Sequence, residues 1–278
     1  MNKKRLTLAV SFICAVFLLS GCTVSNELIA LDTPVAAVKN DGIFTVLLTY
    51  PLAQAINFIS SKIGVFWGIT IVTVALNAVV IALTFKSNVQ MQKMQEIQPE
   101  LQKIQLKYEG RTDNASKQRM AMELQNVYTK HGVNPMGPML VTFIQLPVLF
   151  SMYAAVRRSS AVATGTFLGA NLEMTPGQAW ASKTWVIIAI YVLMIAAQFV
   201  STGIIRWTQE ARAKKEAEKR HKHYEKQPNS QAMMTYGMVG LIAVIMISWP
   251  TALSLYYLIY SVINIVKTIV IDKLTHKE

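Results

Sequence analysis

Charged residues and cysteine are both scarce in this sequence. Asp, Glu, Lys and Arg make up only 15% of its 278 residues, whereas a soluble domain usually has about 25%. The two cysteines, Cys14 and Cys22, lie near the N-terminus, so the sequence has no disulfide framework and no paired-cysteine motif. Glycine-rich phosphate loops and the G-x-S-x-G nucleophile motif are also absent. We therefore expect neither an enzyme nor a cofactor, and no movement driven by ATP hydrolysis within this chain.

Histidine and acidic residues are few as well. The four histidines stand in charged stretches, and none has a Cys or carboxylate partner at metal-site spacing, so we expect no bound metal. The 27 Lys and Arg residues outnumber the 15 Asp and Glu residues, which gives a net charge of +12. Such an excess suggests nucleic acid, but it is also typical of the cytoplasmic loops of membrane proteins. The basic residues gather in two such loops, which favours a membrane protein that binds no DNA.

Long apolar runs are abundant. Hydrophobic residues make up 53% of the chain, its mean hydropathy is +0.35, and several runs reach the roughly 20 residues that a helix needs to cross a bilayer. The predicted fold class is therefore an all-α polytopic membrane protein with five transmembrane helices in the mature chain. The expected spans are residues 63–85, 134–157, 185–206, 231–249 and 250–271, the last two separated by a break at Pro250.

Loop charge predicts the orientation of these spans. The segment 86–133 and the loop 207–230 are rich in Lys and Arg, whereas residues 159–183 contain only Lys183. Because basic loops stay in the cytoplasm, residues 158–184 should form an extracellular loop. The N-terminus is then outside the plasma membrane, and the short tail 272–278 is in the cytoplasm.

The N-terminus has the order of a secretory signal. A basic start is followed by the apolar residues 6–19, which are too few to span a membrane well. The ending Leu19-Ser20-Gly21-Cys22 resembles the lipobox of bacterial lipoproteins. That resemblance implies a signal peptide over 1–21 and acylation of Cys22, for example with palmitate. The alternative is a first transmembrane helix with an incidental cysteine.

Residues 22–62 should lie outside the membrane core. The polar, unpatterned stretch 23–41 predicts an extended linker. Apolar residues then recur at steps of three and four over 43–61, from Phe44 to Ile59, which predicts an amphipathic helix in the outer interface. A short buried helix is the alternative.

The segment 86–133 predicts a cytoplasmic helical hairpin. Ser87 and Gln90 fit a capping box, Pro99 should break or kink the first helix, and His131-Gly132 should end the second. Flexible methionine side chains suit a surface that binds varied apolar partners. This predicts a substrate-recruiting role for Met91, Met94, Met120 and Met122, with simple packing of the hairpin as the alternative.

Several polar side chains fall at similar depth within the apolar spans. The amides are Asn77, Gln145, Gln198 and Asn264, and the nearby hydroxyls include Tyr256 and Tyr257. Polar side chains at membrane depth usually face a bundle interior or a wet cavity. We predict that these six residues line a hydrated groove open to the cytoplasm, the alternative being isolated hydrogen bonds between helices.

Four stretches together resemble a known family: KSNVQMQKMQEIQPELQKIQLKYEG at 86–110, KHGVNPMGPMLVTFIQLPVLFSMYAAV at 130–156, FLGANL at 167–172 and WPTALSLYYLIYSVINI at 249–265. They are similar to the YidC/Oxa/Alb membrane protein insertases, and the lipobox with five spans resembles the Gram-positive, lipoprotein-type form. The resemblance implies an insertase and chaperone for membrane proteins and some lipoproteins, acting alone or with the Sec translocon. It implies nascent membrane proteins and membrane lipid as partners, and also signal recognition particle, its receptor and the ribosome.

The sequence departs from that family in two places. The family usually has Arg where this chain has Asn77, so attraction between a groove arginine and acidic clients does not carry over. After Ile271 only a short tail remains, in contrast to relatives with a long basic tail. Two other functions stay open: a non-catalytic scaffold or assembly factor, and a small-molecule transporter. The transporter is less favoured, since no expected span has a charged residue at its centre.

Overall fold

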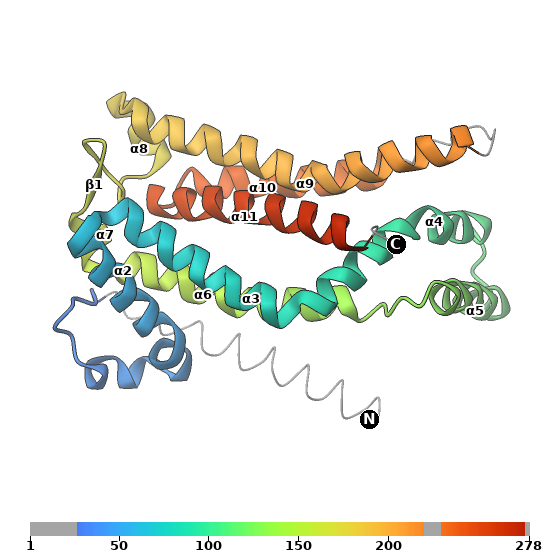
Figure 1. Cartoon of the computed structure of the whole chain (residues 1–278), viewed down its shortest axis with the longest axis horizontal. Coiled ribbons are helices and arrows are strands. Elements are labelled where there is room, and N and C mark those ends of the chain that lie inside the picture. The colour runs from blue at the N-terminus through green and yellow to red at the C-terminus, as the bar shows by residue number, and fades with distance from the viewer. Residues whose placement is uncertain (1–26, 220–228, 276–278) are drawn as a thin grey trace. The chain divides into compact units, whose positions relative to one another are not determined.

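The computed structural model describes residues 27–219 and 229–275 (Figure 1). The signal peptide and Cys22 lie outside these residues. Helices dominate, and within the described ranges the only sheet is the antiparallel pair β1 (Thr166–Phe167) and β2 (Ala170–Asn171). The chain divides into two compact units. The first comprises the described residues up to 73, with 147–191 and 246–256; the second comprises 74–146, 192–245 and the described residues from 257 onward.

The long apolar runs form helices. Among the described residues, three helices contain segments long and apolar enough to cross a membrane, namely α3 (Val65–Glu96), α9 (Trp185–Lys219) and α11 (Thr251–Thr275). Two further helices, α6 (Gly137–Arg158) and α10 (Asn229–Met246), coincide with the remaining predicted spans. The fold class is thus confirmed as an all-α polytopic membrane protein.

In the first unit, the N-terminal segment is folded and is not the extended linker that we predicted. Residues 35–41 form a 3-10 helix, η1 (Val35–Asp41). Ile29 is fully buried and pairs as an isolated parallel bridge with Ser159, just after α6. The sequence did not predict this fold, because the segment has few apolar residues and one of them, Ile29, contacts a distant part of the chain.

The predicted amphipathic helix is present, but its buried face differs from the apolar face of the sequence. The structure has a short π-helix, η2 (Thr45–Thr49), followed by α2 (Tyr50–Ile63). The buried positions of α2 are Ala53, Ile56 and Asn57, whereas Leu47 of η2 is 64% exposed. Asn57 turns inward because its side chain has partners there.

The stretch between α6 and α9 contains only short elements. These are α7 (Ser160–Thr164), the two strands and α8 (Pro176–Ser182). Ala170, Ala179 and Ile187 form a small buried cluster. Backbone hydrogen bonds run from Thr251 N to Met174 O (3.0 Å) and from Ala252 N to Leu172 O (2.9 Å). The start of α11 is therefore attached to this stretch.

In the second unit, α3 continues without interruption to Glu96. Our prediction of a new helix at Ser87 was wrong, since Ser87 and Asn88 are buried within α3. Asn88 donates to the carbonyl of Thr84, one turn earlier, at 3.0 Å. Side-chain bonding within the helix replaces the expected cap.

The hairpin consists of α4 (Gln98–Lys107) and α5 (Asn114–Lys130), which pack on each other (Figure 1). The break predicted at Pro99 occurs at Ile97, so the proline occupies the first turn of α4, where its missing N–H costs nothing. The Asp113 side chain caps α5 by accepting from Ser116 N at 2.7 Å. Four residues with at most 6% exposure form the core, namely Ile97, Leu101, Val127 and Val133.

The chain returns to α6 through a close approach to α3. Asn134 N donates to Gln90 Oε1 at 3.0 Å. A Cβ atom at Gly137 would lie 2.8 Å from Gln90 Cβ, so glycine permits this approach. Helix α9 continues beyond the predicted span 185–206 as far as Lys219. The first part of the predicted cytoplasmic loop 207–230 is therefore helical.

Candidate functional site

Five of the six residues predicted to line a groove belong to the second unit: Asn77, Gln145, Gln198, Tyr257 and Asn264. The sixth, Tyr256, belongs to the first unit and is buried, with 1% exposure. Gln145, Gln198, Tyr257 and Asn264 are half-buried. We therefore restrict the candidate groove to these four residues, whereas Asn77 is buried, with 3% exposure.

A polar contact joins α9 to α11 within this set. The Ser261 hydroxyl lies 2.6 Å from Gln198 Oε1 and 2.8 Å from the Tyr257 carbonyl oxygen. A hydroxyl has a single hydrogen, so it donates fully to one of these acceptors at a time. One turn further along α11, Asn264 hydrogen-bonds the Tyr260 side chain. The face of α11 that carries Tyr257, Tyr260 and Asn264 is consequently polar within an apolar helix.

Helix α3 contributes a row of buried polar residues. Thr73, Asn77, Thr84 and Asn88 follow one another at steps of four, seven and four residues, and each is at most 3% exposed. Thr84 Oγ1 donates to Val80 O at 2.6 Å, and Asn88 Nδ2 lies 2.8 Å from Thr84 Oγ1. Asn77 is more enclosed than a residue lining an open groove should be.

The four methionines predicted to recruit substrates have different surroundings, and two of them, Met91 and Met94, belong to the end of α3. Met94 packs against the hairpin core, so simple packing accounts for it. Met91 and Met120 are half-buried, and Met122 is 58% exposed. Among these four, Met122 is the one most accessible to a partner.

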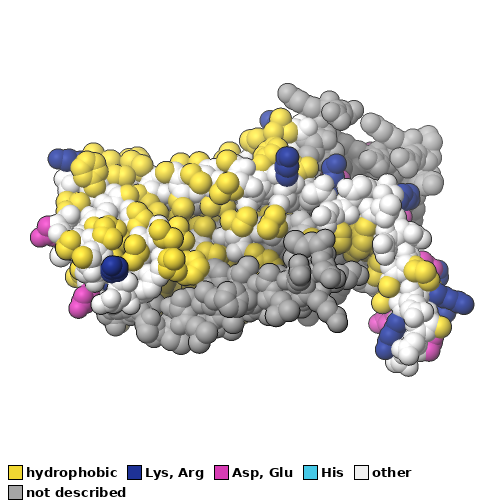
Figure 2. Space-filling model, turned by 90° about the horizontal axis from the view of Figure 1, so that it is seen from below, with side chains coloured by type: hydrophobic (Ala, Val, Ile, Leu, Met, Phe, Trp, Pro, Cys, Tyr) yellow, Lys and Arg dark blue, Asp and Glu magenta, His cyan; other side chains and the backbone are white. Residues whose placement is uncertain are grey.

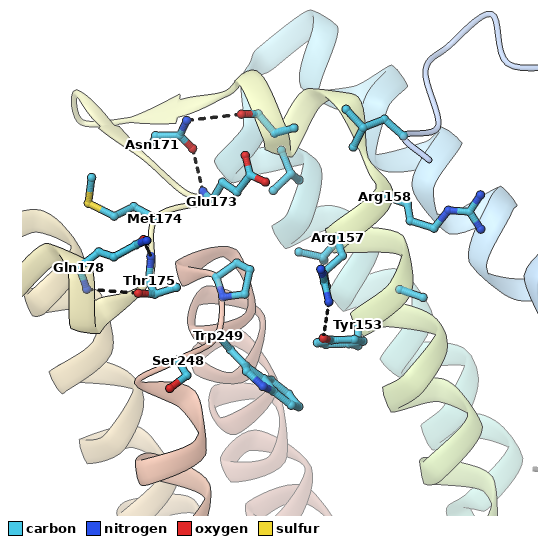
Figure 3. Close-up of a pocket in the computed structure, with 16 residues that line it drawn as sticks. Tyr153, Arg157, Arg158, Asn171, Glu173, Met174, Thr175, Gln178, Ser248 and Trp249 are labelled. Carbon is cyan, nitrogen blue, oxygen red and sulfur yellow. Dashed lines mark hydrogen bonds between the residues drawn. The ribbon is translucent and has the colours of Figure 1, made fainter. Parts of the chain in front are cut away.

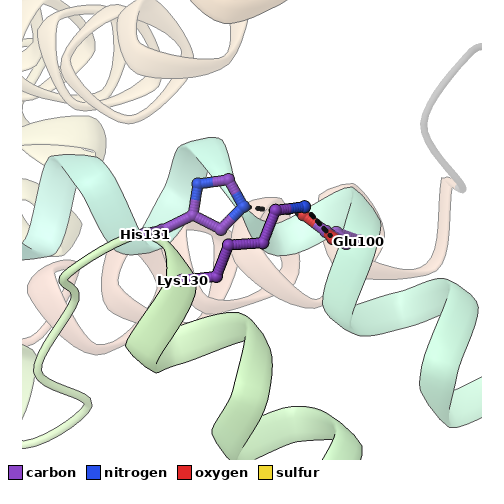
Figure 4. A network of polar contacts seen from close by, with 3 residues as sticks. All are labelled: Glu100, Lys130 and His131. Carbon is purple, nitrogen blue, oxygen red and sulfur yellow. Dashed lines mark hydrogen bonds and ion pairs between the residues drawn. The ribbon is translucent and has the colours of Figure 1, made fainter.

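The open end of the hairpin is joined by polar contacts (Figure 4). Glu100 of α4 accepts from Lys130 Nζ at 3.3 Å and lies 2.8 Å from His131 Nε2. The hydrogen bond with His131, and then Lys130, holds the pKa of the Glu100 carboxyl below its usual value. At the other end, Glu123 Oε1 accepts from Lys107 Nζ (2.7 Å) and from the Tyr108 hydroxyl (2.9 Å). These contacts bond α4 to α5 at both ends.

Surface composition separates the hairpin from the long helices. Large hydrophobic side chains are exposed along α3, α9, α10 and α11, for example Leu83 at 72% and Val244 at 65%. Figure 2 shows hydrophobic side chains along helices and charged side chains of both signs on the hairpin. Exposed apolar helices suit a lipid environment, and a charged hairpin suits water.

Sequence reasoning missed Lys267, the one Lys or Arg residue within the apolar run 250–271 of α11. It is half-buried and lines a pocket of about 290 Å³ together with Ile81 and Phe85 of α3. The sequence does show a lysine within the run 250–271, near the end of that span and not at its centre.

The first unit has a larger pocket, of about 1040 Å³, beside α6 and the chain before α11 (Figure 3). Arg157 Nη1 donates to the Tyr153 hydroxyl at 3.0 Å, and the Tyr153 ring lies 4.8 Å from that of Trp249. Glu173 supplies an acidic group on the lining. None of the predicted groove residues lines this pocket.

Residues 27–219 and 229–275 contain no group of three or more His, Cys, Asp or Glu side chains placed to hold a metal ion. What they do contain is a set of apolar helices with polar residues on inner faces, together with a charged helical hairpin. These features define a polytopic helical membrane protein that has a charged helical hairpin.

The chain belongs to the 60Kd inner membrane protein family, the YidC/Oxa group, whose family model matches residues 58–278. Membrane protein insertase YidC 2 of Bacillus anthracis is 29% identical over 265 residues, covering 95% of this chain and 91% of that protein. Membrane protein insertase MisCA of Bacillus subtilis (strain 168) is 29% identical over 273 residues, covering 97% and 92%. Membrane protein insertase YidC of Oceanobacillus iheyensis is 28% identical, covering 98% and 97%. The predicted family is confirmed.

Proposed function

We propose that this protein is a membrane protein insertase and chaperone that transfers segments of nascent membrane proteins from the cytoplasm into the bilayer. The observation that carries the proposal is the family membership over residues 58–278, with relatives named as insertases that align over almost their whole length. Apolar burial of the inserted helix supplies the driving force, so neither catalysis nor a nucleotide is required.

The client's polar segment passes the polar residues of the second unit. Half-buried amides and hydroxyls at Gln145, Gln198, Tyr257 and Asn264 offer hydrogen bonds within otherwise apolar helices. Since an unsatisfied polar group in hydrocarbon costs several kcal/mol, such partners lower the barrier for a polar segment entering the membrane. The exposed Met122 of the hairpin makes the first contact.

Five helices cross the membrane in this proposal, namely α3, α6, α9, α10 and α11. The basic segments then place the hairpin and the C-terminus in the cytoplasm, and the first unit's N-terminal segment outside. Acylation of Cys22 would tether that outer segment. The Sec translocon, signal recognition particle and its receptor, and the ribosome are the expected partners that deliver or share clients.

Reconstitution tests this function. The purified full-length chain is placed in proteoliposomes, and a single-span membrane protein is translated in their presence. We expect protease-protected insertion several-fold above that of protein-free liposomes. Insertion equal to that of protein-free liposomes, by a chain that still melts cooperatively, would contradict the proposal and favour a scaffold.

A further inference from the structure

The pocket that contains Lys267 lies between α3 and α11, entirely within the second unit. Its lining is apolar apart from the lysine, with Ile81 and Phe85 from α3 and Val262, Val266 and Val270 from α11. Phe85 and the three valines are each at least 41% exposed. The pocket therefore opens onto an outward, apolar surface of the helices.

Lys267 has no hydrogen-bond or ion-pair partner among the described residues. The acidic residue nearest along the helix, Asp272, accepts instead from Gln92 of α3 at 2.7 Å. An ammonium group in an apolar membrane helix is costly unless it meets an anion or water. An anion that pairs with the Lys267 ammonium group must therefore come from outside the described residues.

The depth of Lys267 fits the headgroup boundary of one leaflet. It follows Thr251, the first residue of α11, by sixteen positions, about 24 Å along the helix. The hydrocarbon core is about 30 Å thick, so Lys267 lies just inside its far edge. In the proposed orientation that edge belongs to the cytoplasmic leaflet, which carries the anionic lipids.

We propose that this pocket binds an anionic phospholipid, with part of one acyl chain against Ile81, Phe85 and the α11 valines and the phosphate group paired with Lys267. Basic pockets between membrane helices on the cytoplasmic side bind lipid headgroups in this way. A volume of about 290 Å³ suits a segment of one acyl chain, whereas a client helix is a cylinder roughly 10–12 Å across. The observations therefore favour a lipid over a client helix.

This site makes the protein sensitive to the composition of the bilayer in which it works. A lipid held between α3 and α11 contacts the same two helices that carry Asn77 and Asn264. The inference needs the proposed orientation only to choose the leaflet, and it does not depend on the insertase activity.

Native mass spectrometry of the purified full-length chain tests the proposal. The probe is phosphatidylglycerol, with phosphatidylcholine as the zwitterionic lipid of equal chain length. We expect Lys267→Gln to lower retained phosphatidylglycerol about fivefold, and Lys267→Arg to restore it. Lys273→Gln is the matched control, because Lys273 is exposed on the same helix, and it should change retention less than twofold.

A second variant separates the pocket from the charge. Val266→Phe leaves Lys267 in place but fills the apolar space, and it should also reduce phosphatidylglycerol retention. Equal loss in Lys267→Gln and Lys273→Gln, equal retention of the two lipids by the unmodified chain, or full retention by Val266→Phe would each overturn the proposal. A photoreactive residue at Val266 that labels nascent client rather than phospholipid would overturn it as well.

Discussion

Buried polar side chains are bonded differently in the two units. In the first unit they join segments distant in sequence: Asn57 donates to Ile29 O and accepts from Ser159 Oγ (2.6 Å) and Ala161 N (3.1 Å). In the second unit Thr84 and Asn88 bond to the preceding turn of their own helix, whereas Ser261 contacts both its own helix and Gln198 of α9. Bonds between distant segments resist separation, whereas bonds within a helix survive when that helix shifts sideways.

This difference indicates a division of labour. The first unit holds its segments together through buried contacts that are costly to break. In the second unit Thr84 and Asn88 donate to carbonyl groups of their own helix, and we propose that such local bonds persist when the helices move to admit a client segment.

Asp41→Ala should have the largest effect. Arg158 is 3% exposed, and its Nη1 lies 2.7 Å from Asp41 Oδ2. The contact is an ion pair without hydrogen-bond geometry, and Arg158 Nε also donates to the Glu27 carbonyl at 2.9 Å. Removing the carboxylate leaves a buried charge with less compensation, at a cost of about 3 kcal/mol. Thermal unfolding in detergent measures this, with exposed Lys39→Ala as the control.

Asn57→Leu should follow, at about 2 kcal/mol. The leucine leaves the Ile29 carbonyl, the Ser159 hydroxyl and the Ala161 amide without this partner in a buried place. Lys62→Ala on the same helix is exposed and should leave the melting temperature unchanged. A melting temperature of Asn57→Leu within one degree of the parent would break the claim that the first unit is held by this residue.

Asn77→Leu tests the second unit and should affect activity more than stability. Polar contacts between membrane helices contribute about 1 kcal/mol, so the melting temperature should change little while insertion falls several-fold. Asn77→Arg should retain insertion, because the resemblance implies that relatives carry Arg at this position. Complementation of a depleted strain measures both, and full activity of Asn77→Leu would show that hydrogen bonding at this position is dispensable.

The smallest expected effect concerns the hairpin and pH. The pKa of Glu100 is lowered in the folded state by its hydrogen bonds with His131 and Lys130. The ionised Glu100 carboxylate therefore contributes to the stability of the hairpin at a pH above the pKa that Glu100 has in the unfolded chain. This contribution is lost as the pH falls through the pKa of Glu100 in the folded state. Because Glu100 is 42% exposed, the contribution is about 0.5 kcal/mol. Hydrogen exchange of α4 at pH 6 and pH 4 measures it, and Glu100→Gln should remove the difference.

Sequence patterns predicted the positions of most helices but not the tertiary contacts that their side chains make. Runs of apolar residues predicted the long helices, and the hairpin predicted within 86–133 is present, with a core that includes Ile97, Leu101 and Val127. The inward turn of Asn57 was not predictable, because it depends on Ile29 and Ser159, which are far away in the sequence. The burial of Ile29 escaped prediction for the same reason.

The candidate site was predicted only in part. The four amide side chains predicted at similar depth all belong to the second unit. Depth alone could not distinguish Tyr256, which belongs to the first unit, from Tyr257, which belongs to the second. Lys267 was not predicted as a site residue because it lies near the end of its span, and only charged residues at the centre of a span were taken as a sign of function. Whether a side chain faces a pocket depends on how helices rotate and pack, which the one-dimensional pattern does not specify.

The central claim is that clients pass the polar residues of the second unit and not the larger pocket of the first. Site-specific photocrosslinking in cells that translate a stalled single-span membrane protein tests it most directly, with probes at Gln198 and Tyr257 against probes at Tyr153 and Trp249. We predict adducts to the nascent chain from the first pair and few from the second. Adducts mainly from Tyr153 and Trp249, or from Met122 of the hairpin alone, would contradict the account.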